Sequence, residues 1–105
     1  MKNNLEIAKN IRSIENLKIK ILGKVYSLLK AFNEDESGEV LVDNLCDILI
    51  SAYLLGEKLG YDFEEIDEAL QKKLKLQIID KNFEGEYNFS GLERYIKGRK
   101  REWLI

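Results

Sequence analysis

The chain has 105 residues, enough for one domain, with 45% hydrophobic residues, 34% charged residues and a formal net charge of −2. It contains no His, no Pro and one Cys. These counts exclude a Ser-His-Asp triad, a His-based zinc site, an internal disulfide and a thiolate zinc cage. Any chemistry must therefore depend on carboxylates, Lys or Arg, hydroxyls, Tyr, one thiol or a bound metal.

The charges are unevenly distributed along the chain. Residues 1–32 carry a net charge of +5, residues 33–70 carry −11 and residues 71–105 carry +4. Acidic helices packed against basic neighbours would produce this distribution without any ligand. The alternative interpretation is that the acidic middle holds cations and that the basic flanks meet phosphates.

The apolar stretches of the sequence are short. The most apolar of them, residues 48–55, is far shorter than the ~20 residues that a membrane-spanning helix needs. The N-terminal residues have no apolar run behind their charge, so we expect no signal peptide. We therefore expect a cytoplasmic protein without a membrane partner, and a single Cys fits a reducing compartment.

Large apolar residues recur at helical spacing over residues 5–32 and again over residues 40–59. In the first segment the apolar stripe comprises Ile7, Ile11, Ile14, Ile21, Val25, Leu28 and Phe32. In the second segment it comprises Leu41, Leu45, Ile48, Ala52, Leu55 and Leu59. The second segment is apolar beyond its stripe as well, so we expect its helix to be central or to face a partner subunit.

Two shorter helices are predicted after residue 60. Gly60 is a candidate C-cap of the second helix, and Asp62 is a candidate N-cap of a third helix over residues 63–80. Ser90 is a candidate N-cap of a fourth helix over residues 90–101. The residues of the third helix that we expect to face inward are Phe63, Ile66, Leu70, Leu74 and Ile78.

These patterns predict an all-α fold, an antiparallel helical bundle of about four helices in a single domain, residues 1–105. The second helix carries more apolar surface than one small bundle covers, so we expect a homo-oligomer, a dimer or a tetramer. Cys46 is expected to be a buried small hydrophobe, because the chain has no His to activate its thiol. The basic segment 97–101 is typical of a last helical turn, so a nucleic-acid partner is not expected.

Two acidic segments follow part of the EF-hand pattern for calcium. Residues 33–44 and 80–91 place oxygen-bearing residues at positions 1, 3 and 5, and Gly at position 6. Asn44 and Gly91 stand at position 12, where calcium binding requires a bidentate Glu. Acidic segments with a central Gly are also common connectors between helices.

A second candidate is a carboxylate site for Mg²⁺. Asp43 and Asp47 are one helical turn apart, so both lie on the same side of the second helix. The alternative is that neither residue binds a metal. Asp43 would then only stabilise the first turn of the helix through the helix dipole, and Asp47 would be paired with a neighbouring polar residue. Asp47 lies among apolar residues, where a carboxylate is costly without a partner.

The chain resembles the MazG-like family, a small offshoot, seen in Gram-positive bacteria, of an all-α group of nucleoside triphosphate pyrophosphohydrolases. The segments that carry the resemblance are DNLCDIL at 43–49, LGYDFEE at 59–65, ALQKKL at 69–74, NIRSIE at 10–15, SLLKAF at 27–32 and YNFSGL at 87–92. The resemblance implies Mg²⁺-dependent cleavage between the α- and β-phosphates of a nucleotide. It also implies four acidic metal ligands, arranged as an acid-x-x-acid pair on each of two antiparallel helices.

Most of those carboxylates are missing from this chain. Asp47 matches the Asp of the family, whereas Asn44 stands in place of its Glu. The acidic run of the first helix falls on Gly23, Lys24 and Ser27. One carboxylate cannot hold an octahedral Mg²⁺ against its hydration shell, so we expect catalysis to be weak or lost.

The resemblance also points to nucleotide contacts on the third helix and to a pairing across the first two helices. Lys73 matches a nucleotide-contacting Lys of the family, and Gln71 replaces its Asn. We hypothesise that Lys24 pairs with Asp47 inside the bundle, at the place of the metal. If such a pair were fully buried, its loss from one side would cost on the order of 3–5 kcal/mol.

Two classes of function therefore remain. The first is a MazG-like enzyme or nucleotide binder in which Asp47, Asp43 and Lys73 supply the polar contacts and Mg²⁺ is the cofactor. The second is a non-catalytic helical interaction protein that kept the scaffold and lost the metal. A degenerate EF-hand-like calcium-binding protein is the third interpretation.

Overall fold

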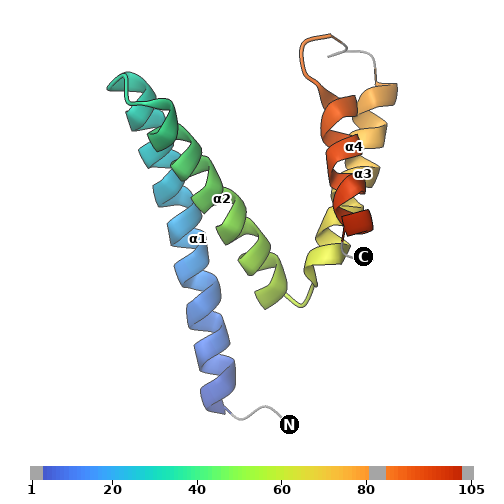
Figure 1. The fold of residues 1–105 in the computed structure, drawn as a ribbon. Coiled ribbons are helices and arrows are strands. Elements are labelled where there is room, and N and C mark those ends of the chain that lie inside the picture. Colours follow the sequence, from blue (N-terminus) through green and yellow to red (C-terminus); the bar gives the residue numbers. More distant parts are fainter. Residues whose placement is uncertain (1–3, 81–84, 103–105) are drawn as a thin grey trace. The chain divides into compact units, whose positions relative to one another are not determined.

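The computed structural model describes residues 4–80 and 85–102, the last three of them as backbone only. This part of the chain forms four α-helices joined by turns, and it contains no strand (Figure 1). The helices are α1 (Asn4–Asn33), α2 (Gly38–Lys58), α3 (Phe63–Ile79) and α4 (Phe89–Glu102). The predicted all-α class is confirmed, and each predicted boundary lies within two residues of the observed one.

The helices pack in two pairs. Helix α1 packs against α2 in one compact unit, residues 1–62, and α3 packs against α4 in another, residues 63–105. Each pair is an antiparallel hairpin (Figure 1). The antiparallel packing of sequence neighbours is therefore confirmed within each hairpin, whereas the single domain over residues 1–105 stays a prediction.

The first hairpin turns within four residues, 34–37. The Ser37 side chain caps α2 by accepting a hydrogen bond from the Val40 amide at 3.5 Å. Because the cap lies before the first large apolar residue, α2 begins two residues earlier than its apolar pattern indicates. Residues 38–44 belong to this helix, so the segment 33–44 does not form a twelve-residue calcium loop. In the other EF-hand-like segment, residues 81–84 lie outside the described residues.

Helix α2 ends in a Schellman motif at Gly60. Gly60 has a positive φ of 103°, its amide donates to Glu57 O at 3.0 Å, and the Tyr61 amide donates to Gly56 O at 3.0 Å. A residue without a Cβ adopts this φ without strain. The predicted role of Gly60 is therefore confirmed, and α3 begins directly after Asp62, the predicted cap position.

Helix α4 is capped by Asn88, so the prediction that Ser90 caps it was wrong. The Gly91 amide donates to Asn88 Oδ1 at 3.0 Å, and the Leu92 amide donates to the Asn88 carbonyl at 3.1 Å. The cap folds over Gly91, where an added Cβ would collide with the Asn88 side chain. The absence of a side chain at Gly91 therefore makes Asn88 the available cap.

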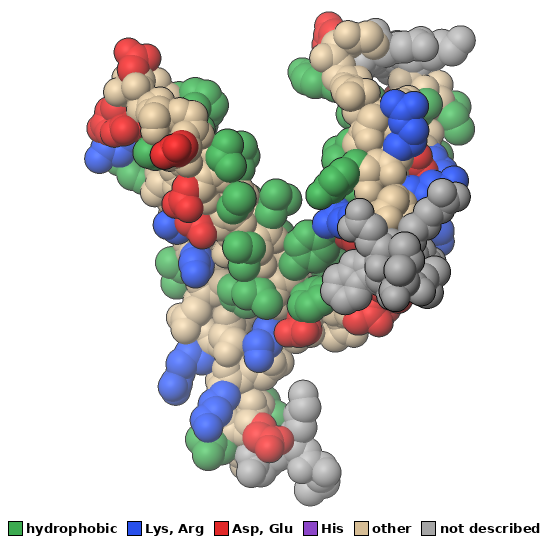
Figure 2. Space-filling model, viewed as in Figure 1, with side chains coloured by type: hydrophobic (Ala, Val, Ile, Leu, Met, Phe, Trp, Pro, Cys, Tyr) green, Lys and Arg blue, Asp and Glu red, His purple; other side chains and the backbone are tan. Residues whose placement is uncertain are grey.

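The interior of the first hairpin is built from small and polar residues. Its buried side chains are Ala31, Asn44 and Ser51. Half of the large apolar residues of the two predicted stripes are exposed, namely Ile7, Ile11, Val25, Phe32, Leu45 and Leu59, and the other half are half-buried. Cys46, predicted to be buried, is exposed as well. The fully buried side chains of this hairpin are small or polar, whereas its large apolar side chains are half-buried or exposed. Figure 2 shows hydrophobic side chains gathered along α2.

The second hairpin buries Leu74 of α3 and Ile96 of α4. Asp67 and Arg99 link the two helices through an ion pair with 3.6 Å between Oδ1 and Nη2. The guanidinium of Arg99 also lies 5.4 Å from the ring centroid of Tyr95. Of the five α3 residues predicted to face inward, Leu74 is buried, Ile66 and Leu70 are half-buried, and Phe63 and Ile78 are exposed. Among the described residues, no helix is long and apolar enough to cross a membrane.

Candidate metal and nucleotide site

Helix α2 presents three polar side chains along one side. Asn44, Asp47 and Ser51 are spaced by three and four residues, which places them above one another on a helix. Asn44 and Ser51 are buried, and Asn44 Nδ2 donates to Val40 O at 3.1 Å. Ser51 is 1% exposed, and its hydroxyl has no hydrogen-bond partner among the described residues. This side of α2 is therefore polar, although most residues of the helix are apolar.

The carboxylate of Asp47 forms an ion pair with Lys24 of α1. Lys24 Nζ lies 3.1 Å from Asp47 Oδ2, with side-chain exposures of 35% and 29%. The hypothesis that these two residues pair across the first two helices is therefore confirmed. The pair is only half-buried, so it is closer in strength to an exposed pair than to a fully buried one.

The residues around Asp47 do not suit Mg²⁺. The ion needs near-octahedral oxygen coordination, and it competes poorly for a carboxylate that already holds a cation. Asn44 offers a single neutral amide oxygen and no carboxylate, because its amide nitrogen cannot bind a metal ion and donates to the Val40 carbonyl. Across the described residues, no three or more Cys, Asp or Glu side chains come together as a metal-binding group. Asp43 is exposed, and its predicted role as a metal ligand stays a prediction.

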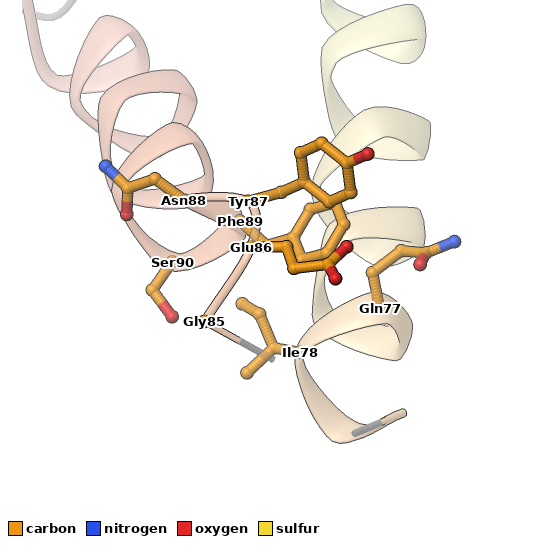
Figure 3. A pocket seen from close by; sticks show the side chains of 8 residues that line it. All are labelled: Gln77, Ile78, Gly85, Glu86, Tyr87, Asn88, Phe89 and Ser90. Atoms are coloured by element: carbon orange, nitrogen blue, oxygen red, sulfur yellow. The ribbon is translucent and has the colours of Figure 1, made fainter. Parts of the chain in front are cut away.

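The second hairpin contains two adjoining hollows beside α3. The first has a volume of about 420 Å³ and is lined by Gln77, Ile78 and residues 85–90 (Figure 3). The second has a volume of about 490 Å³ and is lined by Leu70, Lys73, Leu74, Gln77, Tyr87 and Phe89. We call this second hollow the aromatic groove. It contains Lys73, one of the two predicted nucleotide contacts, whereas Gln71 is half-buried and lines neither hollow.

The two aromatic rings of the groove lie side by side. The ring centroids of Tyr87 and Phe89 are 5.8 Å apart, and their planes are tilted by 52°. Figure 3 shows both rings between the start of α4 and α3, together with Gln77 on α3. These two aromatic residues and Gln77 were not among the predicted site residues. The helical spacing of Leu70, Leu74 and Gln77 could have indicated one shared face, but the spacing does not show that the aromatic pair folds onto it.

The model of the MazG-like family matches residues 7–92 of the chain. Neither the search of curated proteins nor the search of solved structures gave a match.

Proposed function

Since the chain belongs to the MazG-like family, and is thereby related to the nucleoside triphosphate pyrophosphohydrolase superfamily, we propose that it is a member without metal-dependent hydrolysis. In this proposal the helices keep the family scaffold and serve as an oligomeric interaction module. The MazG-like family is generally Mg²⁺-dependent. This chain would thus retain the scaffold of the family without its metal-dependent chemistry.

One observation carries the proposal, the 3.1 Å ion pair between Lys24 and Asp47. Cleavage between the α- and β-phosphates needs a metal ion that polarises the phosphate and activates water. Lys24 supplies a positive charge beside the carboxylate. Unlike a metal ion, its ammonium group cannot coordinate water and phosphate oxygens. An ammonium group also repels a divalent cation at this distance.

The test is a pyrophosphate-release assay with purified full-length chain. Ribo- and deoxyribonucleoside triphosphates are supplied one at a time with Mg²⁺ and then with Mn²⁺. We expect no release above the rate without protein. Metal-dependent release that disappears in the Asp47→Asn variant would contradict the proposal.

A thermal-melting series separates the remaining interpretations. Any ligand that binds only the folded chain raises the melting midpoint by mass action. We expect neither Mg²⁺ alone nor Ca²⁺ alone to raise it. A rise with Ca²⁺ alone would favour the EF-hand interpretation, and a rise with Mg²⁺ alone would favour a surviving metal site.

A further inference from the structure

The first hairpin carries a row of apolar residues along each of its two helices. On α1 the row is Leu22, Val25, Leu29 and Phe32, and on α2 it is Val42, Leu45, Leu49, Ala52, Gly56 and Leu59. Both rows alternate steps of three and four residues, the spacing that aligns apolar side chains along one side of a helix. All of these residues except Gly56 are exposed, and Leu22 is 73% exposed. We call the two rows together the apolar seam.

The two rows of the seam lie on the same side of the hairpin. On each helix the row members, up to residue 56, directly follow residues that are buried or half-buried, as Val25 follows Lys24 and Leu45 follows Asn44. With 3.6 residues per turn, each row is therefore rotated by about 100° from the contact between the helices, in the same sense on both. Because the helices run antiparallel, equal rotation brings the two rows to one side. The hairpin thus presents a two-helix apolar face.

A second hairpin of the same kind is the partner that fits this face. Two further helices with matching rows close such a face into a four-helix bundle, in which the apolar rows of all four helices meet in one core. Another copy of this chain supplies both helices at the same length and spacing. In a two-fold dimer both copies use the same patch, and a face that is apolar along its whole length is complementary to itself.

The charges of the first hairpin differ in sign between its two ends. Residues 33–43, at the closed end, contain five acidic residues and no Lys or Arg, namely Glu34, Asp35, Glu36, Glu39 and Asp43. Residues 4–20, at the open end, contain four basic and two acidic residues, namely Lys9, Arg12, Lys18, Lys20, Glu6 and Glu15. Two closed ends side by side would repel each other, whereas a closed end attracts an open end. The charges therefore favour two hairpins that run antiparallel to each other.

The unequal lengths of α1 and α2 favour the same orientation. Helix α1 has 30 residues and α2 has 21, and the Lys24–Asp47 ion pair sets their register. Residues 4–12 of α1 therefore extend beyond the end of α2 (Figure 1). The exposed large apolar residues of this extension are Leu5, Ile7 and Ile11. In an antiparallel pair the closed end of the second copy lies beside the extension, where its acidic residues meet Lys9 and Arg12.

We propose that the apolar seam binds the apolar seam of a second copy with the two hairpins antiparallel, so that the closed end of each lies beside the α1 extension of the other. This inference rests on the oligomeric part of the proposed function and adds the surface and the orientation to it. It does not depend on the loss of hydrolysis, because neither Lys24 nor Asp47 belongs to the seam.

The experiment is cysteine cross-linking of the full chain in a Cys46→Ser background, which has no thiol and is the control. Ala8→Cys places a thiol on the α1 extension, and Asn33→Cys places one at the closed end. Both positions are exposed and uncharged. With a short bismaleimide we expect a cross-linked dimer when the two variants are co-expressed, and none when either is expressed alone. A cross-link within either variant alone, or none in the co-expressed pair, would overturn the orientation.

Charge reversal tests the contact between the ends. Lys9→Glu with Arg12→Glu places acidic residues against acidic residues, so we expect the dimer Kd from sedimentation at low salt to rise about tenfold. Adding Glu34→Lys with Glu36→Lys to the same chain exchanges the signs of the two ends and should restore the wild-type Kd. A Kd that stays raised after this exchange would overturn the contact.

The matched control is Lys72→Glu with Lys75→Glu, the same change of charge at two exposed positions of α3. We expect it to leave the dimer Kd nearly unchanged, and an equal rise would overturn the assignment to the ends of the first hairpin. A dimer with the wrong cross-links would overturn this inference alone, whereas a monomeric wild type would also contradict the oligomeric part of the proposed function.

Discussion

The amino group of Lys24 decides what the carboxylate of Asp47 can bind. At 3.1 Å the two charges largely neutralise each other, yet both side chains keep about a third of their surface in water. Water screens the attraction, so the pair contributes less to stability than a buried pair does. Its larger effect is on ligand choice, because it removes the negative charge that would attract a metal.

Replacing Asp47 by Asn should therefore have a modest effect on stability. We expect Asp47→Asn to lower the free energy of unfolding by about 1 kcal/mol, measured by urea denaturation. Mg²⁺ affinity should not change. Glu15→Gln, which removes the more exposed pair of Glu15 with Lys18, is the control and should change stability by less than about 0.5 kcal/mol. A loss of Mg²⁺ binding with unchanged melting would contradict this assignment of Asp47.

Restoring carboxylates should create the missing metal site. The double variant Lys24→Glu with Asn44→Glu places two new acids near Asp47. Residue 44 is the position of the family's Glu, and residue 24 lies in the acidic run of its first helix. Three neighbouring carboxylates repel one another until a cation binds. We expect the variant to be less stable than wild type in EDTA and to regain stability with Mg²⁺ in a thermal melt, whereas wild type does not respond. An equal response of both proteins would show that the ion pair does not govern metal binding.

At the scale of the helices, apolar periodicity predicts that a helix exists and that it runs antiparallel to its neighbour better than it predicts the residues at which the helix begins and ends. Helix α3 begins at the predicted residue and stops one residue early. The starts of α2 and α4 depend instead on which nearby polar side chain reaches a free amide, Ser37 in one case and Asn88 in the other. Asn88 and Ser90 lie two residues apart, and the spacing of apolar residues does not show which of them caps α4; the open space above Gly91 favours Asn88.

Two glycines of the first hairpin should respond to alanine in opposite ways. Gly60→Ala places a Cβ at φ 103°, so we expect a loss of about 1–2 kcal/mol of unfolding free energy. Gly23→Ala lies in the middle of α1 with open space around its Cβ, so we expect a gain of up to about 1 kcal/mol. Urea denaturation of both variants measures the two changes. Equal signs would contradict the Schellman geometry at Gly60.

At the scale of the whole molecule, the sequence predicts which residues form an apolar stripe on a helix, but it does not predict which other surface packs against that stripe. Lys24 and Asp47 could be paired from the sequence because both fall on positions of the family's metal site on adjacent helices, where Asp47 matches the family and Lys24 replaces an acid. The aromatic groove could not, because it depends on how the residues before α4 fold toward α3. The predicted stripes of α1 and α2 lie on helices that the structure contains, but half of their large residues are exposed on the hairpin and the other half are only half-buried.

These exposed faces support the predicted homo-oligomer. Leu49, in the middle of α2, is 60% exposed, and large apolar side chains are exposed beside it (Figure 2). Contiguous apolar surface of this kind marks interaction sites. We expect wild type to sediment as a dimer or tetramer at tens of micromolar, and Leu49→Glu to shift it toward the monomer. Lys58→Glu, a charge change at the end of the same helix, should leave the assembly intact. A monomeric wild type would contradict the prediction.

The Asn88 cap makes the effect of one substitution depend on another. Gly91→Ala in wild type would displace the Asn88 side chain and expose an unpaired amide, at a cost of about 1 kcal/mol. After Asn88→Ala the cap is already gone, and the same Gly91→Ala change should instead stabilise the helix by up to about 1 kcal/mol. A double-mutant cycle in urea would measure this reversal of sign. Residues 88 and 91 are thus expected to show sign epistasis, so that an evolving lineage would exchange them together rather than one at a time.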